Sequence, residues 1–217
     1  MARWLTGTTD RGYEEIARRF RQMLEDGRHI FDASANALVG GTDPEAIRRD
    51  LFSTDQRINQ TEQQIRRLIV VRGSVHGAKS FPSLLVMMSL VKDAERIGDY
   101  AKNIFDLASA KAELGSADER QRLVDLKDRV SRLLVKGPNV YESQDIGQAR
   151  AFLAEADRVE DTCDAGLERL LKLRGENAAG RALALRYFKR VTSHVSNVVT
   201  SLVMPLDKLD FFDEPST

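Results

Sequence analysis

The spacing of apolar residues is the feature that most constrains the fold of this chain. Apolar side chains recur at intervals of three and four residues through six long segments, and glycine, proline or helix-capping residues separate these segments. Such spacing places the apolar side chains on one face of an α-helix. We therefore expect six helices of roughly 20 to 30 residues each, which is typical of a helical bundle.

Glycine, proline and capping residues predict where these helices begin and end. Gly40 and Gly41 are expected to end the first helix, and Asp43 to cap the second. Gly137 with Pro138 is expected to end the fourth, and Ser143 to cap the fifth. The predicted helices span approximately residues 10–38, 44–71, 80–115, 117–135, 143–173 and 181–209.

The pattern of helices restarts after roughly 100 residues, which indicates an internal duplication. Residues 100–104 read Y-A-K-N-I and residues 194–198 read H-V-S-N-V, so an asparagine and a β-branched residue take matching places in the third and sixth helices. We expect an all-α fold of two tandem three-helix bundles. The predicted domains are residues 1–115 and 116–217.

Composition excludes several classes of function. The 33 basic and 33 acidic residues give a formal net charge of zero, so no global field attracts nucleic acid or anionic lipid. The longest nearly uncharged run, residues 195–206, is too short to span a bilayer and contains Pro205. The chain opens without a secretory signal, and its one cysteine, Cys163, suits a buried position. We expect a cytoplasmic protein without nucleic-acid binding or membrane insertion.

The segment most informative about chemistry is residues 93–104, D-A-E-R-I-G-D-Y-A-K-N-I. Glu95, Asp99 and Asn103 are spaced four apart and form one polar strip on a helix. Two carboxylates at this spacing can bind a hard or borderline cation. The alternative is a solvated helix face on which Lys92 and Arg96 balance the acids.

This segment resembles the signature of the PhoU family, in which an E/D-x-x-x-D motif followed by asparagine lies on the third helix of each three-helix repeat. Residues 54–65, T-D-Q-R-I-N-Q-T-E-Q-Q-I, are similar to the family's second-helix pattern through Asp55, Asn59 and Glu62. The resemblance implies two three-helix bundles, often in a homodimer, with multinuclear metal clusters in some members. It also implies a regulator of phosphate uptake and of phosphate-responsive transcription, with a phosphate ABC transporter ATPase and a phosphate-sensing histidine kinase as partners.

The second repeat departs from the family pattern. Lys189 stands in place of the first carboxylate and Ser193 in place of the second. Because an ammonium group repels a cation and serine binds one weakly, we expect a metal site only at Glu95 and Asp99, holding iron, manganese, zinc or magnesium. The acids at 157, 160 and 161 lie in a shifted register. Whether they form a site or solvate a helix is open, and solvation is favoured.

No pattern in the chain indicates an enzyme. The histidines at 29, 76 and 194 are expected to be surface or capping residues, and the chain has no Glu-x-x-His pair, phosphate-binding Gly-rich loop or nucleophile elbow. The leading hypothesis is a regulator whose helical faces bind a transporter ATPase or a kinase. A variant of this hypothesis is a divergent PhoU-like protein that contacts a phosphate channel or a transporter of another class. The alternatives are a metal-dependent enzyme or metal-storing bundle, and a structural helical protein without metal.

Overall fold

A computed structural model describes residues 11–76, 80–173 and 177–209 of the chain. These residues form six long α-helices and one short 3₁₀-helix, which confirms the predicted all-α class. The helices are α1 (Arg11–Val39), α2 (Pro44–His76), α3 (Phe81–Ser109), α4 (Ala117–Ser143), α5 (Ile146–Leu171) and α6 (Ala179–Thr200), and the 3₁₀-helix is η2 (Leu206–Lys208). None of the described helices is long and apolar enough to cross a membrane.

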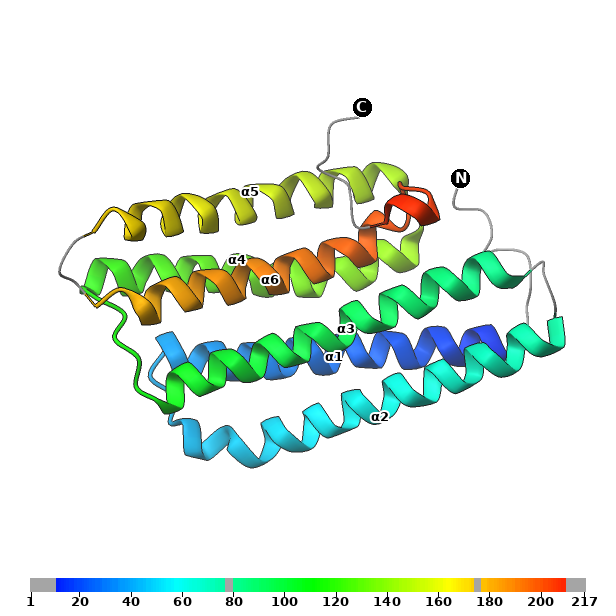
Figure 1. The fold of residues 1–217 in the computed structure, drawn as a ribbon, viewed down its shortest axis with the longest axis horizontal. Coiled ribbons are helices and arrows are strands. Elements are labelled where there is room, and N and C mark those ends of the chain that lie inside the picture. The colour runs from blue at the N-terminus through cyan, green and yellow to red at the C-terminus, as the bar shows by residue number, and fades with distance from the viewer. Residues whose placement is uncertain (1–10, 77–79, 174–176, 210–217) are drawn as a thin grey trace.

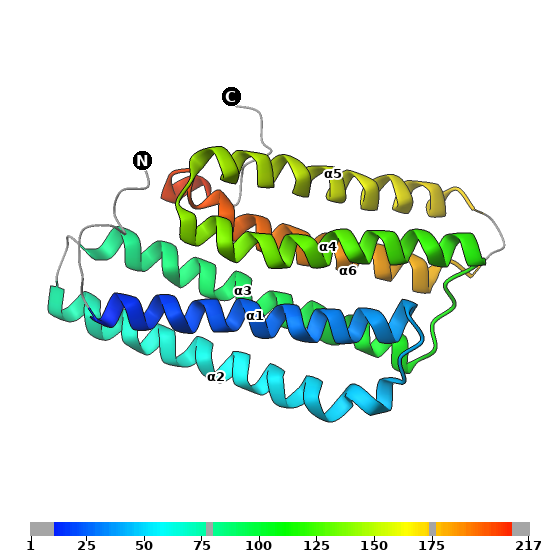
Figure 2. The same cartoon turned by 180° about the vertical axis from the view of Figure 1, so that it is seen from behind.

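The six helices form two antiparallel three-helix groups that lie against each other (Figures 1 and 2). We call α1–α3 the first repeat and α4–α6 the second repeat. The two repeats pack mainly through α3 against α6 and α1 against α4. The predicted boundary after residue 115 falls in the connection between α3 and α4, and the division into domains 1–115 and 116–217 stays a prediction.

Aromatic side chains join the two repeats across one continuous core. Buried apolar side chains from all six helices belong to this core. Phe31 of α1 meets Phe188 of α6 edge to face at 5.8 Å between ring centroids, and Phe20 of α1 meets Tyr141 of α4 at 5.7 Å. Because such pairs stabilise a contact beyond their buried area, the repeats are held together by packing and not only by the chain.

Local capping explains several helix ends. The Asp43 carboxylate accepts a hydrogen bond from the Glu45 amide at 3.1 Å, which agrees with the predicted cap of α2. Gly41 has φ of +82°, a left-handed conformation that glycine adopts at little cost. At α4, Ser116 and Glu119 form a reciprocal capping box.

The fourth and fifth helices correct the sequence prediction. Gly137 and Pro138 were expected to end a helix, but α4 continues through both to Ser143. A Cβ atom on Gly137 would lie 2.6 Å from Val195 of α6, so this glycine permits close helix packing. The cap of α5 is Asp145, whose carboxylate accepts from the Gln148 amide at 3.0 Å, and not Ser143.

Other predicted ends were also displaced. The helix α2 continues past residue 71 to His76, α3 ends at Ser109 and not near residue 115, and α6 ends at Thr200 ahead of Pro205. Of the connection predicted at residues 72–79, residues 77–79 lie outside the described residues. Cys163 is fully buried, as expected, and burial raises the pKa of its thiol to about 12.

Candidate functional site

The predicted carboxylates lie where α2 and α3 run side by side. Glu95 and Asp99 of α3 share this face with Asp55 and Glu62 of α2, and we call these four residues the acidic strip. A Cβ atom on Gly98 would lie 3.2 Å from Ile58 of α2 and 3.8 Å from an Asp55 carboxylate oxygen. The glycine therefore allows the close approach of α3 to α2 that brings the strip together.

Basic side chains pair with every carboxylate of the acidic strip. The Lys102 ammonium lies 3.0 Å from Asp55 and 3.1 Å from Asp99, and so bridges α2 and α3. The other ion pairs are Lys92 with Glu95 at 2.5 Å, Arg66 with Glu62 at 2.8 Å, and Arg96 with Asp99 at 3.3 Å. The strip is thus an ion-pair network, and not only a row of hydrated acids.

Glu95 is a largely buried carboxylate of this network. Its side chain is 11% exposed, and burial raises the pKa of Glu95 above its ordinary value. Lys92 opposes this pKa increase, whereas the negative charges of Asp99 and Glu62 add to it. A further positive charge beside Glu95 would favour its ionised form.

The strip offers carboxylate oxygens as donors for a metal ion. Within the described ranges no group of three or more histidine, cysteine, aspartate or glutamate side chains is arranged around one metal position. Magnesium and similar hard cations are commonly held by one or two carboxylates with water completing the coordination. Glu95 and Asp99 would fit that pattern once a cation displaced the side chains that now pair with them, which are those of Lys92, Arg96 and Lys102.

The corresponding face of the second repeat has different chemistry. Lys189 of α6, at the place of Glu95, pairs with Asp164 of α5 at 2.5 Å. Ser193, at the place of Asp99, lines a polar cavity of about 350 Å³ between α5 and α6. Asp157 and Glu160 are half-buried and line the same cavity, whereas Asp161 is exposed. Two members of this acidic cluster therefore lie at a cavity and not on the open surface of α5.

Asp93 of α3 connects this cavity to the first repeat. One carboxylate oxygen of Asp93 lies 2.8 Å from His194 Nδ1 and accepts a hydrogen bond from Asn197 at 2.9 Å. Tyr100 stacks on His194 with 5.6 Å between centroids, and the Tyr100 hydroxyl accepts from Arg190 at 3.3 Å. We call Asp93, His194 and Asn197 the inter-repeat junction.

The junction corrects the prediction for His194. It also reveals a role for Asp93 that the sequence did not indicate. His194 was expected at the surface but is only 7% exposed, because α3 covers it. By contrast, His29 pairs with Asp50 and is exposed, as expected. The signal for the junction was the match of residues 100–104 with 194–198. Tyr100 and His194 take matching positions in α3 and α6 and meet at the contact between the repeats.

The fold and the acidic strip together define a helical-bundle protein of two three-helix repeats with carboxylates on one repeat. Residues 20–108 match the family model of the PhoU domain. This part of the chain is therefore similar to the PhoU domain, which confirms the predicted resemblance. The matched residues contain the whole acidic strip.

Solved structures extend the likeness to nearly the whole chain. PhoU from Pseudomonas aeruginosa is 18% identical, with a TM-score of 0.73 over 93% of this chain and 98% of that one. The phosphate transport system regulatory protein PhoU from Streptococcus pneumoniae is 14% identical, with a TM-score of 0.71 over 95% of this chain and 100% of that one. At these identities the likeness shows the fold. No curated protein matches the sequence significantly.

Proposed function

We propose that this protein regulates phosphate transport and phosphate-responsive signalling through protein contacts, without catalysing a reaction. The observation that carries the proposal is a PhoU domain over residues 20–108 inside a chain that has the PhoU fold over nearly its whole length. The similar protein from Streptococcus pneumoniae is a phosphate transport system regulatory protein. The partners we propose are a phosphate ABC transporter ATPase and a phosphate-sensing histidine kinase.

Regulation of this kind requires two distinguishable complexes. A ligand or partner can bias signalling only by the difference between its affinities for the two states. We propose that the chain acts in the cytoplasm as a homodimer. We also propose that a dimer bound to one partner is no longer available to bind the other. Light scattering of the purified chain tests the dimer separately from partner binding.

We further propose that a cation at Glu95 and Asp99 stabilises one helical face of the regulator. The buried carboxylate of Glu95, with its raised pKa, supports this part. Of iron, manganese, zinc and magnesium, the hard cations magnesium and manganese suit a site of two carboxylates and water. Zinc is usually bound by four ligands that include nitrogen or sulfur. When bound, the cation would supply positive charge where Lys92 now stands.

The direct test measures binding of the purified chain to the ATPase subunit and to the kinase's cytoplasmic part from the same genome. Each titration is run with manganese and again with a chelator. We expect saturable binding to the ATPase or the kinase, weakened by the chelator. Failure of both partners to bind under either condition would contradict the proposed function.

A pair of variants separates the metal part from the partner part. Glu95→Ala with Asp99→Ala removes the proposed ligands, and Asp161→Ala with Glu168→Ala removes two exposed carboxylates from α5 as a charge-matched control. We expect the first variant to bind partners equally with and without manganese, and the control to behave as the parent. Partner binding that responds to manganese in both variants would place the cation elsewhere.

A further inference from the structure

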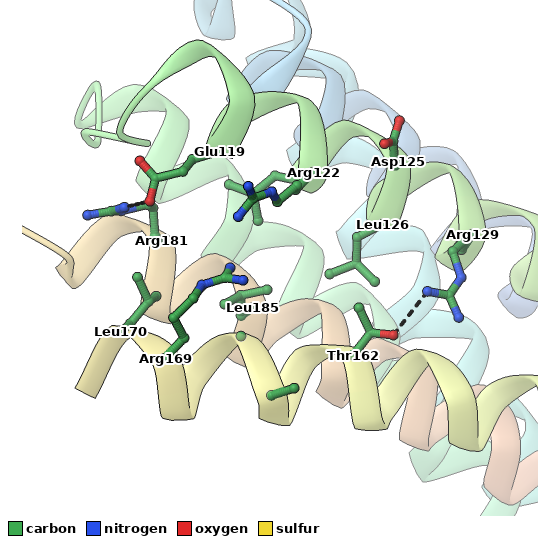
Figure 3. A pocket seen from close by; sticks show the side chains of 13 residues that line it. Glu119, Arg122, Asp125, Leu126, Arg129, Thr162, Arg169, Leu170, Arg181 and Leu185 are labelled. Atoms are coloured by element: carbon green, nitrogen blue, oxygen red, sulfur yellow. Dashed lines mark hydrogen bonds and ion pairs between the residues drawn. The ribbon is translucent and has the colours of Figure 1, made fainter. Parts of the chain in front are cut away.

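A second concave surface lies on the second repeat, away from the acidic strip. It is a cavity of about 440 Å³ between α4, α5 and the start of α6 (Figure 3). This volume falls in the range of roughly 300 to 1,000 Å³ that small-molecule sites occupy. Its lining combines an apolar floor with a rim of arginines, which is the combination that decides the class of ligand.

Arginine side chains supply most of the charge around this cavity. Arg122 and Arg129 come from α4, Arg169 from α5 and Arg181 from α6, against two acids, Glu119 and Asp125. In a chain whose formal net charge is zero, this cavity therefore carries two positive charges in excess. The first turns of α4 and α6 lie at the same end of the bundle as the last turn of α5, so the helix dipoles oppose one another there and the arginines supply the positive charge.

The arginines divide into two that are fixed within the protein and two that are available. Arg181 is 4% exposed and pairs with Glu119, and Arg129 donates to the Thr162 hydroxyl at 3.1 Å. The side chains of Arg122 and Arg169 make neither a hydrogen bond nor an ion pair with any described residue. Figure 3 shows both guanidinium groups extending into the space between α4 and α5.

The floor of the cavity is apolar and closely packed. Four buried leucines form it: Leu123, Leu126, Leu170 and Leu185. A Cβ atom on Gly166 of α5 would lie 2.8 Å from a methyl group of Leu185, so this glycine allows Leu185 to close the floor. An apolar floor beneath arginines suits a ligand that has both an apolar body and an anionic end.

We propose that this cavity binds an organic phosphate of mononucleotide size. The phosphate would lie between Arg122 and Arg169, since a guanidinium forms paired, charge-assisted hydrogen bonds with phosphate oxygens. A phosphate has two charges and several acceptor oxygens, enough for two guanidinium groups, whereas a carboxylate has one charge. The flat base would cover the leucine floor. The site is separate from the acidic strip, and its ligand need not take part in metal binding.

The test is isothermal titration of the full chain with AMP at low ionic strength, beside adenosine and inorganic phosphate. We expect saturable binding of one AMP per chain. Adenosine and inorganic phosphate should each bind with an affinity at least about tenfold lower than that of AMP. Adenosine lacks the charge that the arginines recognise, and inorganic phosphate lacks the body that the floor recognises.

Paired variants locate the binding. Arg122→Ala with Arg169→Ala removes the two available guanidinium groups, and both residues are exposed, so the helices should form normally by circular dichroism. Arg150→Ala with Arg158→Ala removes two exposed arginines of α5 that lie outside the cavity. We expect the first variant to bind AMP at least about tenfold more weakly and the second to match the parent.

Three results would overturn the proposal. They are an absence of AMP binding to the parent at millimolar concentration, equal binding by the two paired variants, and adenosine or inorganic phosphate binding as tightly as AMP. The first result would contradict the proposed ligand. The second would contradict the binding role of the two arginines. The third would contradict joint recognition by the charged rim and the apolar floor.

Discussion

The outer faces of the two repeats have the same helical framework and different chemistry. In the first repeat, α3 presents Glu95 and Asp99 beside the acids of α2. In the second repeat, α6 presents Lys189 and Ser193 at the matching places. Both helices form and both pack, so the carboxylate pair is not a requirement of the fold. Glu95 even has a raised pKa because its ionised form is poorly solvated there. The pair is better explained by binding than by folding.

The inner faces of α3 and α6 differ from the outer faces in that their side chains pair with each other. There α3 and α6 contact each other, and the side chains are complementary: the Asp93 carboxylate accepts hydrogen bonds that His194 and Asn197 donate. The comparison of outer and inner faces therefore separates the residues of the proposed cation site from residues that join the repeats. Four predictions test this separation, from the largest expected effect to the smallest.

Replacing Phe188 by alanine should give the largest loss of stability. Phe188 is fully buried and packs on Phe31 of the first repeat, so the change opens a cavity at the contact between the repeats. We expect the free energy of unfolding to fall by about 3–5 kcal/mol, measured by urea denaturation. Phe52→Ala is the control, because Phe52 is 45% exposed, and should cost about 1 kcal/mol. Separate unfolding transitions for the two repeats would contradict a shared core.

Replacing Asp93 by alanine should have the next largest effect. The change leaves donors of His194 and Asn197 without their acceptor at a position that excludes most water. We expect a loss of about 2–4 kcal/mol by the same denaturation measurement. Asp93→Asn keeps one acceptor oxygen and should lose less. An alanine variant as stable as the asparagine variant would show that the junction contributes little to joining the repeats.

Metal bound at the first repeat alone should stabilise the protein. At a concentration of manganese near one hundred times its dissociation constant, the parent should gain about 2.7 kcal/mol, and the Glu95→Ala, Asp99→Ala variant should gain nothing. A Lys189→Glu, Ser193→Asp variant restores the carboxylates to α6 and should bind one more ion by titration calorimetry. Equal manganese stabilisation of the parent and the alanine variant would remove the assignment to Glu95 and Asp99.

Glu95→Gln should give the smallest effect, and its sign depends on pH. The folded-state pKa of Glu95 is raised above its ordinary pKa of 4.5. The protonated carboxyl group therefore favours folding fully below pH 4.5, and this contribution to stability is lost as pH rises through the raised pKa. The neutral glutamine should therefore stabilise the metal-free protein near pH 7 by up to about 1 kcal/mol and have little effect near pH 4. Glu155→Gln, on an exposed pair with Lys136, is the control. A variant that is less stable than the parent at pH 7 would reverse the sign of the Glu95 contribution.

Apolar spacing predicted the helices because it reports which face of each helix is buried. The glycine and proline signals for helix ends failed at Gly137 and Pro138, since glycine serves both at helix ends and at close helix contacts. Only the position of Val195, far along the chain, distinguishes the two. The predicted end of α3 was also wrong because it was placed at a glycine. The helix stops at Ser109, and Gly115 belongs to the short connection that follows.

The candidate site was predicted in its acids but not in its bases. The spacing of Glu95 and Asp99 gave one polar strip, and the family resemblance added Asp55 and Glu62. The bridge that Lys102 makes between α2 and α3 depends on the distance between helices, which the spacing of residues along one helix does not contain. The junction was missed for the same reason, since Asp93 and His194 are 101 residues apart.

The inter-repeat junction also bears on how interchangeable the two halves of a duplicated chain remain. Two newly copied halves are equivalent, and either could take the place of the other. Here Asp93 needs a histidine at 194, whereas the matching position in the first repeat is Tyr100. A chain assembled from two first repeats would bring a tyrosine to that place and lose the hydrogen bond from the imidazole. The two halves are therefore not interchangeable at this contact. A substitution at Asp93 requires a matching substitution in the other half.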